Sequence, residues 1–188
     1  MSTSHSSSDA PVFLIGYMAS GKTTLGRALA AATGRRFIDL DEYIEASTGK
    51  TISRIFAEDG EDHFRRTESR LLSEIIDNPG NNGGVVVACG GGTPCFGDNM
   101  SVMNDAGLTV WLTAPHEVII RRLIAERSAR PLVAQLSDGG ELENYVIENL
   151  RRRAPHYGRA ATRFDSSRLE TESEIADSVR LFIEKYLP

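Results

Sequence analysis

Residues 13–26 read FLIGYMASGKTTLG, and this stretch is the strongest single indication of the fold. A short apolar run is followed by the spacing G-x-x-x-x-G-K-T, which covers Gly16 to Thr23. Glycines let backbone N–H groups turn toward phosphate oxygens, and the N-terminus of a following helix adds partial positive charge. The stretch therefore predicts a phosphate-binding loop between a strand and a helix.

The side chains of this loop indicate a nucleoside triphosphate. Lys22 can reach the β- and γ-phosphates, and the Thr23 hydroxyl can coordinate Mg²⁺. Glycine-rich turns near a lysine also arise without a ligand, but the full spacing between a strand and a helix favours phosphate binding. The loop does not identify the acceptor. The residues expected to bind nucleotide here are Ala19, Ser20, Gly21, Lys22, Thr23 and Thr24.

Outside the loop, apolar patterning predicts an alternation of strands and helices. The expected strands are 12–15, 36–40, 85–88, 109–112 and 163–165. The expected helices are 22–33, 41–48, 51–57, 61–76, 115–126, 141–161 and 172–186. Helices of this length between buried strands indicate βαβ units and a parallel sheet covered on both faces. We therefore expect a single α/β domain over residues 12–188, after a disordered serine-rich lead-in over residues 1–11.

Composition narrows the class of protein. Of the 188 residues, 40% are apolar and 25% charged, which is typical of a soluble globular domain, and the net charge of −5 argues against a nucleic-acid binder. Cys89 and Cys95 are too few for a disulfide framework and lack the spacing of metal ligands. No apolar run approaches the roughly 20 residues of a membrane span, and the N-terminus lacks the apolar core of a secretory signal. We expect a cytoplasmic protein that binds no membrane.

Two aspartates follow the second expected strand. In FIDLDEY, Asp39 and Asp41 are two residues apart, so the alternation of strand side chains places both carboxylates on one face. Beside a phosphate loop, one carboxylate could hold a metal ion through water, and the other could accept the proton of a substrate hydroxyl. The alternative is that Asp41 only caps the next helix, which leaves Asp39 unexplained.

Three further stretches contain candidate binding groups. Arg65 shares a helix face with Glu61 and Glu68, although this spacing is also that of an ordinary surface salt-bridge ladder. VVVACGGGTP places three glycines directly after a strand. Ordering three glycines costs backbone entropy, so they indicate close approach of a ligand to the main chain, with a loose turn as the alternative. The arginine block at 151–153 fits a solvated helix face equally well.

Taken in order, these motifs resemble the shikimate kinases. The shared motifs are G-x-M-x-S-G-K-T, D-L-D, F-R-R-x-E, C-G-G-G, R-P-L and R-A-P-x-Y, spread over residues 12–165. The resemblance implies a P-loop kinase fold, a three-layer α/β/α sandwich with a five-stranded parallel sheet and a mobile lid at about residues 128–140. It also implies transfer of the γ-phosphoryl of ATP to the 3-hydroxyl of shikimate, with Mg²⁺, on the route to aromatic amino acids.

The resemblance also implies roles for single residues. Lys22 holds the phosphates, Thr23 binds the metal, and Asp39 holds the metal indirectly. Arg130, in the lid, reaches the transferring phosphoryl group. Arg127, just before the lid, stacks on adenine. Asp41 binds shikimate hydroxyls as the candidate base, and Glu68 supports an acceptor-binding arginine. The implied catalytic residues are Lys22, Asp41 and Arg130. The implied acceptor-binding residues are Asp41, Arg65, Gly90, Gly91, Gly92 and Arg153.

Some positions depart from the family pattern. Ala19 stands where a glycine is usual in the loop, and Thr93 and Pro94 stand where a small residue and valine are frequent. Neither change removes an implied catalytic group. Another small-molecule P-loop kinase, such as one acting on gluconate, would leave the arginines and the triple glycine unexplained. A non-catalytic nucleotide-binding domain would leave the lid arginine and both aspartates unexplained. We expect a monomer whose partners are ATP and shikimate.

Overall fold

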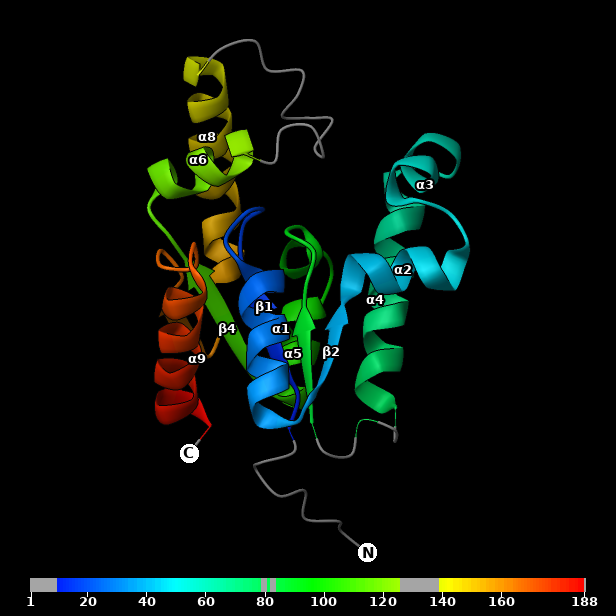
Figure 1. The fold of residues 1–188 in the computed structure, drawn as a ribbon. Helices are drawn as coiled ribbons and strands as arrows, with labels where there is room; N and C mark the ends of the chain where they lie inside the picture. The colour runs from blue at the N-terminus through cyan, green and yellow to red at the C-terminus, as the bar shows by residue number, and fades with distance from the viewer. Residues whose placement is uncertain (1–9, 79–80, 82–83, 126–138, 188) are drawn as a thin grey trace, which may run out of the picture.

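The computed structural model describes residues 10–78, 81, 84–125 and 139–187. Within these residues, five strands form one parallel sheet in the order β2-β3-β1-β4-β5 (Figure 1). The strands are β1 (Val12–Ile15), β2 (Arg36–Asp39), β3 (Val85–Ala88), β4 (Leu108–Thr113) and β5 (Thr162–Asp165). The expected α/β class and the five-stranded parallel sheet are confirmed.

Helices cover both faces of this sheet, which gives three layers. Helices α1 and α9 pack against each other on one face, while the apolar sides of α4, α5, α6 and α8 meet the other (Figure 1). The helices are α1 (Lys22–Thr33), α2 (Leu40–Thr48), α3 (Ile52–Glu58), α4 (Glu61–Asp77), α5 (Asn99–Ala106), α6 (His116–Ala125), α8 (Gly139–Tyr157) and α9 (Glu172–Tyr186), with a 3₁₀ turn η2 (Thr93–Cys95).

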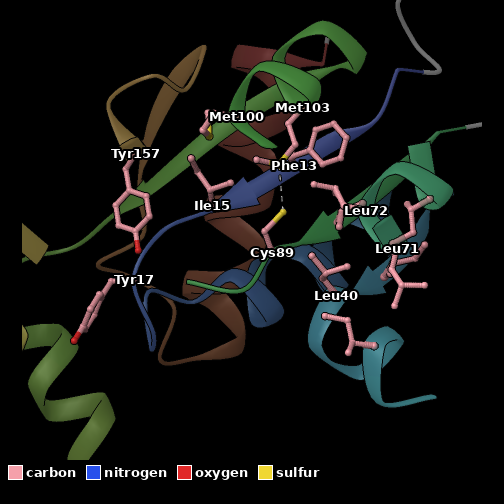
Figure 2. Packing of buried hydrophobic residues seen from close by; sticks show 14 of the residues in the cluster. Phe13, Ile15, Tyr17, Leu40, Leu71, Leu72, Cys89, Met100, Met103 and Tyr157 are labelled. Atoms are coloured by element: carbon pink, nitrogen blue, oxygen red, sulfur yellow. Dashed lines mark hydrogen bonds between the residues drawn. The ribbon is translucent and has the colours of Figure 1, made fainter. Parts of the chain in front are cut away.

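The central strand β1 contributes to two hydrophobic cores. Phe13 and Ile15 pack in the cluster that contains Met100, Met103 and Tyr157 (Figure 2). Val12 and Leu14 point the opposite way, into the cluster under α1 and α9. All four strand side chains are fully buried, and burial of such a side chain contributes about 1.5–3 kcal/mol. A strand covered on both faces must be apolar throughout, which explains the unbroken apolar run before the phosphate loop.

Several expectations about the elements need correction. Helix α5 was not expected, because its polar residues obscure a core-facing pair, Met100 and Met103. Strand β2 ends at Asp39, and Leu40 already belongs to α2. Helix α8 begins at Gly139 and ends at Tyr157, so it overlaps the end of the expected lid and stops before residue 161. The remainder of the expected lid and most of the expected lead-in lie outside the described residues.

None of the helices in the described part of the chain is both long enough and apolar enough to cross a membrane.

Candidate active site

A cavity of about 160 Å³ opens at the carboxyl ends of β1, β2 and β3. This is the edge at which open parallel sheets bind ligands. Backbone and side chains of the phosphate loop form one wall, and the two aspartates and the first glycines of the triple glycine form the other. The lining residues are Met18, Ala19, Gly21, Lys22, Thr23, Thr24, Asp39, Asp41, Ala88, Cys89, Gly90 and Gly91.

The phosphate loop depends on its two spaced glycines. Gly16 adopts a φ of 146°, and a Cβ there would lie 2.7 Å from the Leu112 carbonyl oxygen. Gly21 adopts a φ of 86° and caps α1. Lys22 Nζ donates to the carbonyl oxygens of Gly16 at 3.0 Å and Tyr17 at 2.7 Å, so its ammonium group lies across the loop. Backbone donors, a helix N-terminus and a lysine therefore meet at one point, as anion binding requires.

The departure at Ala19 has a structural cost. Ala19 has a φ of 57°, the left-handed region in which a non-glycine residue costs roughly 1–2 kcal/mol. Its carbonyl oxygen accepts a hydrogen bond from Arg122 Nη1 at 3.4 Å. The backbone at Ala19 therefore adopts a conformation that glycine would adopt more easily.

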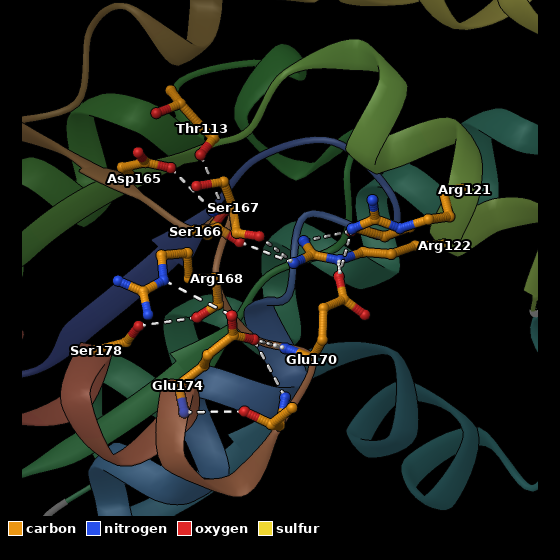
Figure 3. Close-up of polar contacts among 12 residues, drawn as sticks. Thr113, Arg121, Arg122, Asp165, Ser166, Ser167, Arg168, Glu170, Glu174 and Ser178 are labelled. Atoms are coloured by element: carbon orange, nitrogen blue, oxygen red, sulfur yellow. Dashed lines mark hydrogen bonds and ion pairs between the residues drawn. The ribbon is translucent and has the colours of Figure 1, made fainter.

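Arg122, which the sequence analysis did not identify, connects helix α6 through hydrogen bonds to the phosphate loop and to the segment after β5. Besides reaching Ala19, it donates to the carbonyl oxygens of Ser166 at 3.0 Å and Ser167 at 3.2 Å, and to Glu170 at 2.8 Å (Figure 3). Its side chain is only 10% exposed. The arginine pair near the end of α6 was the available signal, but the partners lie more than 40 residues away in the sequence.

Thr23 and Asp39 form a pair suited to a metal ion. The Thr23 hydroxyl donates to Asp39 Oδ2 at 2.8 Å, and both residues line the cavity. The other carboxylate oxygen of Asp39 accepts the backbone N–H of Asp41 at 3.1 Å. Asp39 is therefore the N-cap of α2, so the alternative that Asp41 caps this helix is wrong.

Asp41 still faces the same cavity as Asp39, but for a different reason than expected. It lies in the first turn of α2 instead of continuing the alternation of a strand. Its carboxyl is accessible from the cavity, yet the surrounding walls exclude enough water that burial, followed by repulsion from Asp39 and Glu68, raises its pKa to about 6. A carboxylate with this pKa is suited to general-base chemistry near neutral pH.

The triple glycine is packed against charged side chains. A Cβ on Gly90 would lie 2.9 Å from Glu68 Oε1 and 3.0 Å from Asp41 Oδ1. A Cβ on Gly91 would lie 3.0 Å from a guanidinium nitrogen of Arg153.

A Cβ on Gly92 would lie 2.6 Å from Arg65 Nη1. Real Cβ atoms essentially never approach other atoms this closely. The stretch is therefore no loose turn, because each glycine makes room for an acid or an arginine.

Arg65 is not part of an ordinary surface ladder. Its Nη1 donates to Glu68 Oε2 at 2.8 Å, and Glu68 is fully buried. The third expected member, Glu61, is exposed and lies 3.6 Å from Arg65 Nε. A buried carboxylate needs a cation and hydrogen bonds to offset its lost hydration, so the Arg65–Glu68 pair is a built element of the site.

Arg153 approaches the triple glycine from α8. Its guanidinium lies 5.6 Å from the ring centroid of Tyr17, and it is half-buried, whereas Arg151 and Arg152 are exposed. Tyr157, one turn further along α8, donates its hydroxyl to the Gly91 carbonyl oxygen at 2.6 Å. Of the three arginines in this block, Arg153 therefore belongs to the site, and Arg151 and Arg152 face solvent. The tyrosine of R-A-P-x-Y was present in the motif, but it had been given no role.

The geometry brings together the expected residues that the structure describes. Loop residues 19–24, both aspartates, Arg65, the triple glycine and Arg153 meet at one edge of the sheet. Arg127 and Arg130 lie outside the described residues.

Comparison with known proteins identifies the family. A family model described as "SKI: Shikimate kinase" matches residues 18–184. A shikimate kinase of Phocaeicola vulgatus is 46% identical over 168 residues, which cover 89% of this chain and 93% of that protein.

Solved structures give the same result. The crystal structure of shikimate kinase from Bacteroides thetaiotaomicron superposes with a TM-score of 0.89 at 41% identity, covering 95% of this chain and 99% of that one. The shikimate kinase of Acinetobacter baumannii, solved in complex with shikimate, superposes with a TM-score of 0.77 at 30% identity, covering 95% and 93% of the two chains. The resemblance found in the sequence motifs is confirmed.

Proposed function

The chain belongs to the shikimate kinase family, and we propose that it transfers the γ-phosphoryl of ATP to the 3-hydroxyl of shikimate. The products are 3-phosphoshikimate and ADP, on the route to chorismate and the aromatic amino acids. The observation that carries this proposal is the convergence of Asp41, Arg65 and Arg153 on the triple glycine beside the phosphate loop. A neighbouring structure solved with shikimate bound supports the choice of acceptor.

The acceptor side of the site matches a small polyhydroxy acid. Arg65 and Arg153 come from two different helices and lie against adjacent glycines, so they can clamp one carboxylate. Guanidinium groups pair with carboxylates through two parallel hydrogen bonds, which fixes orientation as well as charge. Following the family motif, we assign the main chain of Gly90, Gly91 and Gly92 to contacts with the acceptor, and Gly90 and Gly91 line the cavity. Asp41 accepts the hydroxyl proton as that oxygen attacks the γ-phosphorus.

The nucleotide side of the site supplies positive charge at the transferring phosphoryl group, where negative charge develops during the reaction. The loop residues 19–24 cradle the phosphates, and Lys22 stabilises the transferring group in place of water. We assign Arg130 to the same task and Arg127 to the adenine, following the family motif. Exclusion of water by the lid favours transfer to the acceptor over hydrolysis of ATP.

A magnesium ion fits the residues present. The Thr23 hydroxyl and the Asp39 carboxylate face each other across 2.8 Å, and hard oxygen donors are what Mg²⁺ prefers. We propose that Thr23 binds the ion directly and Asp39 through water. When bound, Mg²⁺ supplies neutralisation of phosphate charge.

The remaining properties follow from the proposed reaction. We propose that residues 12–188 work as one domain. Residues 10 and 11 contact it, because Arg35 Nη1 donates to the Ala10 carbonyl oxygen at 2.6 Å and the Leu108 N–H donates to the Pro11 carbonyl oxygen at 2.9 Å. The substrates are small molecules, so a monomer acting in the cytoplasm without nucleic acid or membrane suffices.

The decisive experiment is ADP release with shikimate, gluconate or no acceptor. We expect shikimate alone to stimulate release strongly over the rate without acceptor. Stimulation by gluconate instead would favour the rival small-molecule kinase. ADP release that no acceptor stimulates would favour a nucleotide-binding domain without kinase activity.

A further inference from the structure

Thr93 is fully buried directly after the triple glycine, in a position for which the family motif leads us to expect a small residue. Its hydroxyl donates to Glu68 Oε1 at 2.6 Å. The other oxygen of that carboxylate, Oε2, accepts the hydrogen bond from Arg65. The threonine and the arginine therefore hold the two oxygens of one buried carboxylate.

The backbone around Thr93 is itself fixed. Its N–H donates to the Gly90 carbonyl oxygen at 3.1 Å, and its own carbonyl oxygen accepts from Asn99 Nδ2 at 2.9 Å. Asn99 is buried as well. A β-branched side chain has little freedom about χ1, so a pinned backbone also fixes the direction of the hydroxyl.

Glu68 has no water to replace a lost partner, because its side chain is fully buried. An oxygen of a buried carboxylate that loses its donor keeps the full cost of desolvation, and the carboxylate reorients to recover it. Rotation of this carboxylate would displace the arginine bonded to its second oxygen.

We propose that Thr93 is a positioning residue for the acceptor site: its hydroxyl fixes the Glu68 carboxylate, which in turn fixes the guanidinium of Arg65. This inference rests on the proposed function, since it assigns Arg65 to the carboxylate of the acceptor. It assigns a role to a buried threonine that the sequence motifs leave without one.

The test compares Thr93→Val with Thr93→Ser in steady-state kinetics with ATP and shikimate. Valine keeps the volume and removes the hydroxyl, so we expect the KM for shikimate to rise about five- to tenfold, with the KM for ATP and kcat within about twofold. Serine restores the donor, so we expect a KM for shikimate within about twofold of the wild type.

Thr109→Val is the matched control. Thr109 is a fully buried threonine whose hydroxyl bonds Asn104 and the Ala161 N–H, away from the site. We expect it to lower thermal stability without changing either KM. The inference is overturned if Thr93→Val leaves the KM for shikimate unchanged, if serine fails to restore it, or if the control raises it equally.

A second pair of variants keeps the test possible if Thr93→Val does not fold. Thr93→Ala and Thr93→Ser differ in one oxygen atom, so an equal KM for shikimate in both would also overturn the inference. If shikimate did not stimulate ADP release by the wild-type protein, the proposed function itself would be wrong. If the wild type were active but the variants kept its KM for shikimate, only the role of Thr93 would be wrong.

Discussion

The two halves of the site are built in different ways. The phosphate loop is six consecutive residues, Gly16 to Gly21, between β1 and α1, and Lys22, Thr23 and Thr24 follow directly in the first turn of α1. The acceptor half takes Asp41 from α2, Arg65 from α4, Arg153 from α8 and three glycines from the segment after β3. A local site can be recognised from spacing alone, whereas a distributed site requires the fold to bring its members together. Substitutions should therefore separate the two halves.

The largest effect is expected at the phosphate loop. Lys22→Ala removes the ammonium group that we propose stabilises the transferring phosphoryl group, and we expect kcat to fall about a thousandfold. Lys50→Ala is the control, because Lys50 pairs with Asp59 on the surface between α2 and α3. Near-normal turnover of Lys22→Ala, measured by ADP release, would rule out its phosphate role.

The acceptor half is tested by Arg65→Ala. The variant removes the guanidinium that we propose pairs with the acceptor carboxylate, and loss of one partner of such a charged pair costs about 2–5 kcal/mol of binding, so we expect the KM for shikimate to rise about a hundredfold. The KM for ATP should stay within about twofold, because the two halves are separate. Arg66→Ala on the same helix is the control, since Arg66 is exposed. An equal rise in the KM for ATP and the KM for shikimate would mean that Arg65 does not belong to the acceptor half.

The pH profile reports on the group that joins the two halves. The pKa of Asp41 is raised to about 6, and a base is inactive when protonated, so kcat/KM for shikimate should fall as pH drops through 6. At pH 5 it should be about tenfold below its plateau.

A titration of the protein alone separates this effect from titration of ATP. Repulsion from Asp39 is one cause of the raised pKa, so Asp39→Asn should shift the Asp41 carboxyl ¹³C titration to lower pH. An unchanged midpoint would mean that the two carboxylates do not interact.

The smallest effect is expected at Ala19. Glycine carries no penalty at a φ of 57°, so Ala19→Gly should gain about 1 kcal/mol and raise Tm by about 2–4 °C. A looser loop must be ordered on binding, so the KM for ATP should rise about two- to threefold. Ala31→Gly, an exposed position inside α1, should lower Tm instead. A lower Tm for Ala19→Gly would contradict the strain at this position.

The contrast between the halves also explains what the sequence could predict. Strand β1 and helix α1 were placed correctly to the residue, because an apolar run, two glycines and a lysine all act within one short stretch. The acceptor residues were assigned through the order of motifs, since no local pattern says that α4 and α8 meet beside β3.

Long-range contacts account for what was missed. Arg122 binds carbonyl oxygens of the phosphate loop and of the segment after β5, and such contacts leave no periodic trace in the sequence. The pairing of Asp39 with Asp41 was expected for the wrong reason, because the strand ends one residue early and its last carboxylate caps the helix. A strand whose side chains alternate and a helix that is capped by the last strand residue both place two acids two residues apart, so the spacing of Asp39 and Asp41 does not distinguish them.

The triple glycine has a consequence for inheritance. Any codon change that replaces Gly90, Gly91 or Gly92 adds at least a methyl group, and each addition crowds a different partner, whose side chain must shift: Glu68 and Asp41, Arg153, or Arg65. Missense alleles in three adjacent codons should therefore produce three distinguishable defects, one in the base, one in each arm of the arginine clamp. Among natural variants, we therefore expect these three adjacent positions to stay glycine.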